Sequence, residues 1–177
     1  DTFSGYGARS RDFVKSLIKE KDSEWDIKIM PQRWGDCPWN FLSKDDPLRQ
    51  RFMPQLQQKP DIWMQITVPN EFQAIGKFNI GVTAGIETTI FPAEFIEGMN
   101  KMNLNLVSSH HSKNVAQQSQ FEKKNQQGQV ERVIKLEKPI EVLFEGLDLN
   151  KYYKNSNKTS ILDGINEEFC FLYTGHW

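Results

Sequence analysis

The feature that most constrains the fold is the alternation of short apolar runs with stretches of helical spacing. Short apolar runs that are bounded by glycine, proline or polar clusters are typical of buried strands. The strand-like runs cover 61–68, 78–85, 104–109 and 140–147, and the helical stretches cover 8–21, 46–57, 92–102 and 111–127. Strands that alternate with helices favour a parallel sheet. We therefore expect an α/β fold: a Rossmann-like parallel sheet with flanking helices.

Several shorter features refine this expectation. In the first helix Phe13, Val14, Leu17 and Ile18 fall on one face. Residues 26–30 alternate and predict a short strand, which is followed by a long loop rich in proline, glycine and aromatics. Pro47 suits the first turn of the helix expected over 46–57. Gly128, with apolar residues around it, indicates a small hairpin or a surface insertion.

The charge balance and the cysteines limit the class of partner. Among 177 residues, 22 basic and 23 acidic side chains give a net charge of −1, which argues against bulk electrostatic binding of nucleic acid or anionic membrane. No apolar run of the sequence approaches the roughly 18–20 residues that a membrane span needs. Cys37 and Cys170 lack metal-ligand spacing, so we expect free thiols in a reducing compartment and, by default, a cytoplasmic location.

The two ends suggest a piece of a larger architecture. A glycine-containing turn into a helix normally follows a strand, so we expect a first strand to be missing before Ser4. Residues 151–166 resemble a linker, and the apolar run at 169–177 is typical of the first strand of another α/β unit. The predicted organisation is therefore a domain over 1–166 and the start of a truncated second domain over 167–177.

The stretch Ser4-Gly5-Tyr6-Gly7 is the first candidate binding site. Glycines at a helix start let the backbone approach a ligand closely, and the amides there favour an anion such as phosphate. Arg9 and Arg11 can add positive charge. The alternative is a structural turn with solvated arginines.

Three stretches, in order, resemble the GT-B glycosyltransferases that act on nucleotide sugars, of the family 4-like type. They are SGYGARSRDFVKSL, PAEFIEGMNKMNLNLVSSHHSKNVAQQS, and PIEVLFEGLDLNKYY with the later FCFLYTGHW. The resemblance implies the N-terminal, acceptor-side domain of a two-domain enzyme. That enzyme transfers a sugar, with retention, from a nucleotide-sugar donor to an unknown acceptor in the cleft between its domains. The fragment alone is then expected to be inactive.

The resemblance also implies roles for particular residues. Contacts to the donor phosphates or the acceptor fall on Ser4, Gly5, Tyr6, Gly7, Arg11, Thr88 and Lys113. Many relatives carry a histidine near the strand end at 81–89, which this sequence lacks. Glu87 is the candidate replacement, contacting sugar hydroxyls or accepting the acceptor's proton. The alternative is that Glu87 caps the next helix or pairs with a lysine.

The remaining candidate residues are two tryptophans and a histidine pair. Trp34 and Trp39 can stack on a sugar ring, or they can cover the long loop as core. His110 and His111 are adjacent, point in different directions and have no evident third ligand, so we expect no metal site there. The sequence has no Asp-x-Asp motif, and helix starts with basic residues can stabilise a departing diphosphate without a metal. Neither a metal nor a covalently bound cofactor is expected.

Two competing functions stay open. A dinucleotide-dependent oxidoreductase needs G-x-G-x-x-G, but Ser10 stands where the third glycine belongs, counting from Gly5. The other competitor is a non-catalytic α/β module with a ligand-binding or structural role. Ser108, Ser109 and Ser112 include at least one expected helix cap, and Asp148 is interpreted as a turn cap.

Overall fold

The computed structural model describes residues 1–150, 152–153, 164–167 and 169–171. The chain divides into two compact units, Asp1–Phe144 and Glu145–Trp177. All of the helices and strands of the described residues belong to the first unit. The predicted domain boundary at 166 lies on the described residues 164–167, whereas most of the predicted linker at 151–166 lies outside the described residues.

Four strands form one parallel sheet, as the sequence predicted. The strands are β1 (Ile62–Ile66), β2 (Phe78–Thr83), β3 (Leu104–Val107) and β6 (Ile140–Val142), in the order β1-β2-β3-β6. Ile62 lies opposite Phe78, Ile80 opposite Leu104, and Asn105 opposite Ile140. Because all four strands run the same way, their carboxyl ends lie at one edge of the sheet.

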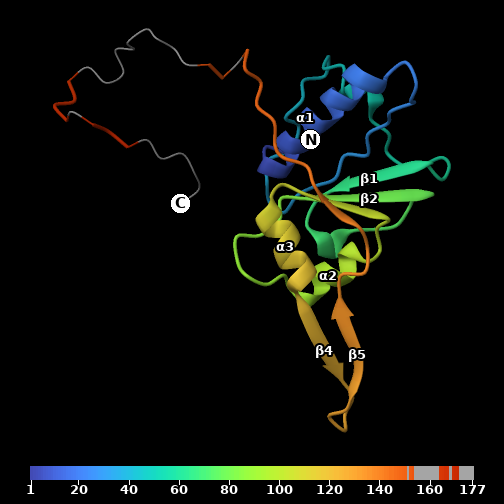
Figure 1. Cartoon of the computed structure of the whole chain (residues 1–177). Helices are drawn as coiled ribbons and strands as arrows, with labels where there is room; N and C mark the ends of the chain where they lie inside the picture. The colour runs from blue at the N-terminus through green and yellow to red at the C-terminus, as the bar shows by residue number, and fades with distance from the viewer. Residues whose placement is uncertain (151, 154–163, 168, 172–177) are drawn as a thin grey trace. The chain divides into compact units, whose positions relative to one another are not determined.

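Helices flank both faces of this sheet, which confirms the α/β fold with a parallel sheet. Helix α1 (Gly5–Lys21) lies on one side, and α2 (Ala93–Met99) and α3 (His110–Gln118) lie on the other (Figure 1). Two short 3₁₀ turns, η1 (Arg49–Arg51) and η2 (Pro69–Glu71), complete the helical elements of the described residues. Ser4 and Ser109 cap α1 and α3 with their hydroxyls, which satisfies amides that a helix start leaves unpaired.

The hydrophobic core lies on the side of the sheet that α2 and α3 cover. Its buried members are Phe72, Phe91, Ile96, Met99, Met102, Val107, Val115, Ala116 and Ile140. Gly98 of α2 packs directly on the Pro69 carbonyl, and a side chain there has no room. Gly81 of β2 gives similar room to the Phe72 ring. Because these two glycines lack side chains, η2 and Phe72 can pack between the sheet and α2.

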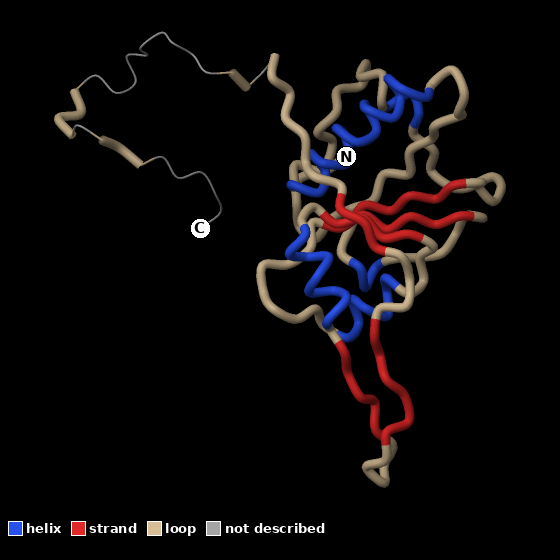
Figure 2. The backbone as a smooth tube through the Cα atoms, in the orientation of Figure 1, coloured by secondary structure: helices blue, strands red, loops and turns tan. Residues whose placement is uncertain are grey.

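An antiparallel hairpin projects from the α2–α3 side (Figure 2). Its strands are β4 (Gln120–Lys124) and β5 (Val130–Lys135). Phe121 lies opposite Ile134, and both pack against the core. Arg132 bonds Glu97 of α2, and Gly128 has a φ of 79° in the connecting turn. The hairpin predicted around Gly128 is therefore confirmed.

Two elements predicted near the N-terminus were wrong. Residues 26–30 form no strand; Ile29 makes a single bridge to Phe52 instead. The helix predicted over 46–57 is reduced to η1. Phe52 is already extended, and Pro54 cannot donate the hydrogen bond that a helix interior requires.

Other predicted elements are shorter than expected. The helix predicted over 111–127 ends at Gln118, because Ser119 adopts an extended conformation and Phe121 pairs with Ile134. The strand predicted over 140–147 ends at Val142. Residues 169–171 are not in a strand, and the remainder of the predicted strand at 169–177 lies outside the described residues.

Candidate functional site

The carboxyl edge of the sheet receives the start of α1. The Tyr6 hydroxyl lies 3.1 Å from the hydroxyl oxygen of Thr83, the last residue of β2, and accepts a hydrogen bond of 3.3 Å from the amide of Ala84. The N label in Figure 1 stands beside this end of the sheet. Ligands of open α/β sheets bind at this edge, so the stretch Ser4–Gly7 lies where the strand-end rule places a site.

Glycine stands at positions 5 and 7 for different structural reasons. The Ser4 hydroxyl accepts a 3.0 Å hydrogen bond from the amide of Gly7, so that amide already has a partner. A side chain on Gly7 would overlap the Thr2 carbonyl and lie 2.6 Å from its hydroxyl oxygen, whereas Gly5 has open space around it. Gly7 is required for packing. Gly5 and Tyr6 keep their amides at the helix start, where an anion is favoured.

The two arginines of α1 take separate directions. Arg11 donates a 2.7 Å hydrogen bond to the Thr2 carbonyl and lies 3.6 Å over the Phe41 ring. Arg9 reaches the Leu143 carbonyl, 3.5 Å away, just past the end of β6. Burial lowers the pKa of both guanidinium groups, yet arginine stays charged in proteins. Arg9 therefore brings a positive charge to the carboxyl edge, and Arg11 braces the chain before α1.

The segment after β2 is hydrogen-bonded to Ser108, just before α3, and to the first turn of α3. Ser108 donates a 2.6 Å hydrogen bond to the Ala84 carbonyl, and Ser112 donates one of 3.4 Å to the Ile86 carbonyl. A His111 ring nitrogen lies 3.1 Å from the Thr88 carbonyl. Gly85 has a φ of +90°, and a side chain there would overlap Ser112. The segment that carries Glu87 and Thr88 is thus held at both ends by hydrogen bonds to its own backbone carbonyls.

Glu87 is exposed between these anchor points. The Thr88 hydroxyl donates a 3.2 Å hydrogen bond to the Ile90 carbonyl, and Glu87 precedes it directly. A carboxylate carried on a backbone held in place by hydrogen bonds is well suited to contact a ligand at a defined position. The arrangement therefore allows Glu87 to bind hydroxyl groups or accept a proton.

The first turn of α3 carries a basic side chain that is already paired. Lys113 lies 2.7 Å from a carboxylate oxygen of Glu141 in β6, with 24% and 64% of the two side chains exposed. Because the Glu141 side is exposed to solvent, the pair contributes only about 1 kcal/mol, and an anionic ligand can compete for Lys113. His110 of the same turn meets the Phe144 ring edge to face, with centroids 5.6 Å apart.

The two predicted stacking tryptophans lie in the segment before η1. Trp34 packs on Tyr6 with ring centroids 4.8 Å apart and an interplanar angle of 50°. Trp39 forms an isolated bridge with Thr2, and the Arg33 guanidinium lies 5.9 Å from the centroid of its ring. Both rings are partly exposed. Trp34 therefore contacts the start of α1 through Tyr6, whereas Trp39 pairs with the residues that precede α1.

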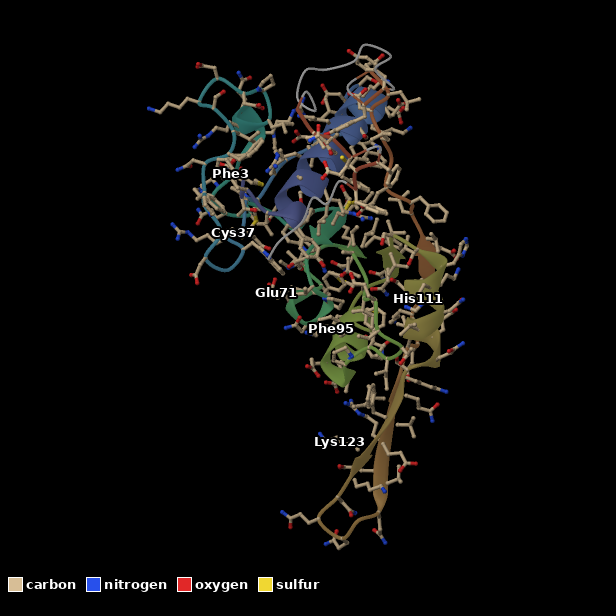
Figure 3. All side chains as sticks on the ribbon, turned by 90° about the vertical axis from the view of Figure 1, so that its left-hand side faces the viewer. Phe3, Cys37, Glu71, Phe95, His111 and Lys123 are labelled. Carbon is tan, nitrogen blue, oxygen red and sulfur yellow. The ribbon has the colours of Figure 1, made fainter. Side chains whose placement is uncertain are left out.

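The structure brings several predicted residues to one edge and adds one that sequence reasoning missed. Figure 3 places His111 on α3 and Lys123 on the projecting hairpin. Thr83 lies within the strand end at 81–89 that the sequence already singled out. Glu141 was not predicted to be part of the site, and the sequence carries no signal for it, because its partner Lys113 lies 28 residues away.

Within the part of the chain that the structure describes, no group of three or more histidine, cysteine, aspartate or glutamate side chains is arranged to hold a metal ion. Across that same part, no helix combines the length and apolarity of a membrane span. In comparisons with known proteins, no family model matches the chain, and neither a curated protein nor a solved structure matches it.

Proposed function

We propose that this chain is a glycosyltransferase domain, which transfers a sugar from a nucleotide-sugar donor to an acceptor. The supporting observation is the meeting of three segments at the carboxyl edge of the sheet. The start of α1 reaches Thr83 through Tyr6, and the segment with Glu87 is bound to the first turn of α3. Helix α3 and the start of α1 belong to stretches that resemble the GT-B enzymes. A second, donor-side domain completes the active cleft in this proposal.

Charge stabilisation is the first task of such a site. When the bond between the anomeric carbon and the diphosphate breaks, negative charge grows on the diphosphate. The amides of Gly5 and Tyr6 and the Arg9 guanidinium face that charge from the acceptor-side domain. Fixed dipoles and cations stabilise a leaving group in this way because they need no rearrangement during the reaction. Lys113 joins them once the ligand displaces Glu141.

The acceptor hydroxyl must lose its proton as its oxygen bonds to the anomeric carbon. Glu87 is the proposed group that orients this hydroxyl or takes its proton, because its carboxylate is exposed and its backbone is anchored. Trp34, packed on Tyr6, offers an apolar ring face to a sugar. No step requires a metal in this scheme.

Donor turnover by the full-length gene product tests the proposal. The protein is incubated with UDP-, GDP-, ADP- and TDP-sugars, and free nucleotide is followed over time. Slow release from one donor supports the proposal and identifies that donor. The matched variants are Glu87→Gln, which should lower turnover, and Glu94→Gln, an acidic residue of α2 outside the site, which should not. Absence of release and of nucleotide binding across the panel would favour a non-catalytic binding module.

A further inference from the structure

An unfilled slot lies beside the outer strand of the sheet. A cavity of about 230 Å³ separates α1 from β1 and from the segment 27–34. Even an engineered void of roughly 150 Å³ is large for a protein core. The α1 wall of the slot is a single helix face, formed by Tyr6, Ser10, Phe13, Val14 and Leu17.

The edge of β1, and not one of its faces, forms the second wall. Residues 63–67 all line the slot, although successive side chains of a strand point to opposite faces. The amide of Thr67 donates to the Val82 carbonyl at 3.1 Å, and the amide of Phe78 donates to Asp61 at 2.9 Å. Because alternate residues of a parallel strand bond to opposite sides, the backbone groups of Met64 and Ile66 point away from β2 and into the slot.

The third wall, formed by the segment around Ile29, is also a backbone edge. The amide of Ile29 donates to the Arg51 carbonyl, and the Ile29 carbonyl accepts from the amide of Met53, both at 2.9 Å. The backbone groups of its neighbours Lys28 and Met30 therefore point to the opposite side, toward the slot. Two extended edges thus face each other across the slot, and the apolar face of α1 covers the space between them.

The position of the first residues gives the direction of a strand that fills this slot. Asp1 and Thr2 line it, and α1 leaves from there at the carboxyl edge, where Tyr6 meets Thr83. A segment that passes through the slot and joins Asp1 must run toward that edge, parallel to β1. The strand, α1 and the segment 27–30, which bridges Phe52 through Ile29, then follow the order of the strand–helix–strand unit typical of parallel sheets.

We propose that this slot holds one more β-strand, an extended apolar segment of the same chain that joins Asp1 from upstream in a longer protein. About five residues match the length of β1. The side chains that face α1 meet Phe13, Val14 and Leu17, so they are apolar. The strand gives hydrogen-bond partners to Met64 and Ile66 and removes the open edge, since purely parallel sheets are usually buried. This inference does not depend on sugar transfer.

Hydrogen exchange of single amides in the protein expressed from its full reading frame tests the proposal. Gln65 and Thr67, which bond to β2, serve as internal references. With the strand in place, Met64 and Ile66 exchange about as slowly as these two. At an open edge they exchange faster by about a hundredfold or more. Fast exchange at Met64 and Ile66, or a reading frame without an extended apolar segment upstream, would overturn the proposal.

Two further measurements separate this strand from other occupants. Protection that disappears on dilution assigns the slot to a second copy and overturns the proposal. Met64→Pro removes a slot-facing amide; proline is tolerated at an open edge but not inside a sheet. The variant should therefore lower the Tm of the full-length protein clearly, and an unchanged Tm contradicts the added strand.

Discussion

Substituting the two glycines of Ser4-Gly5-Tyr6-Gly7 one at a time separates packing from ligand binding. Gly7→Ala places a methyl group against the Thr2 carbonyl, 2.6 Å from the Thr2 hydroxyl oxygen and 3.1 Å from Arg11. Thr2 is only 3% exposed, and its carbonyl holds Arg11, so the backbone has to move. Overpacking of this kind costs about 1–3 kcal/mol. For a chain of this size that is about 2–4 °C in Tm for each kcal/mol.

Gly5→Ala is the matched control. Nothing lies within 4 Å of the added methyl group, and alanine favours a helix over glycine by up to about 1 kcal/mol. The Tm of Gly5→Ala should therefore stay the same or rise. Thermal unfolding by circular dichroism measures both variants. Equal stability of Gly7→Ala and the parent protein, or equal losses in both variants, would refute the assignment of Gly7 to packing.

Three other predictions concern the core and the site. Phe72→Ala removes a ring that is 1% exposed and should cost about 3–5 kcal/mol, measured by urea unfolding, with little loss contradicting the core assignment. Ser119→Ala leaves the buried amide of Phe91 without its 2.8 Å acceptor and should cost about 1–3 kcal/mol; the same assay checks it, and a neutral result would mean that another acceptor replaces the hydroxyl. Glu87→Gln should leave the free energy of unfolding unchanged within about 0.5 kcal/mol, because Glu87 is exposed, and a large loss of stability would assign it a structural role.

The sequence predicted the elements in which local pattern and tertiary packing agree. Residues 61–68, 78–85 and 104–109 carry apolar runs that became β1, β2 and β3. The sequence-based prediction failed where contacts with distant residues determine the secondary structure. Gln120 to Lys124 have ordinary helical propensity, but Phe121 gains more by pairing with Ile134 and packing on the core. Tertiary contacts override weak propensities in this way.

The candidate site was predictable to the extent that strand ends mark it. Gly5 and Thr88 follow from the rule that ligands bind at the carboxyl edge of a parallel sheet. The pairing of Lys113 with Glu141 depends on the order of β3 and β6 in the sheet, which the sequence alone does not fix. The different roles of Gly5 and Gly7 depend on the path of Thr2, which the local pattern does not contain.

Mapping amide chemical shifts while a nucleotide sugar is titrated into the full-length gene product tests the central claim most directly. The proposal predicts that the largest shifts fall on Gly5, Tyr6, Glu87 and Thr88, with the hairpin at Lys123 unchanged as an internal control. It also predicts that the free nucleoside diphosphate changes the amide chemical shifts of Gly5 and Tyr6. Shifts that gather on the hairpin, or saturating binding without any change at the carboxyl edge, would contradict the account.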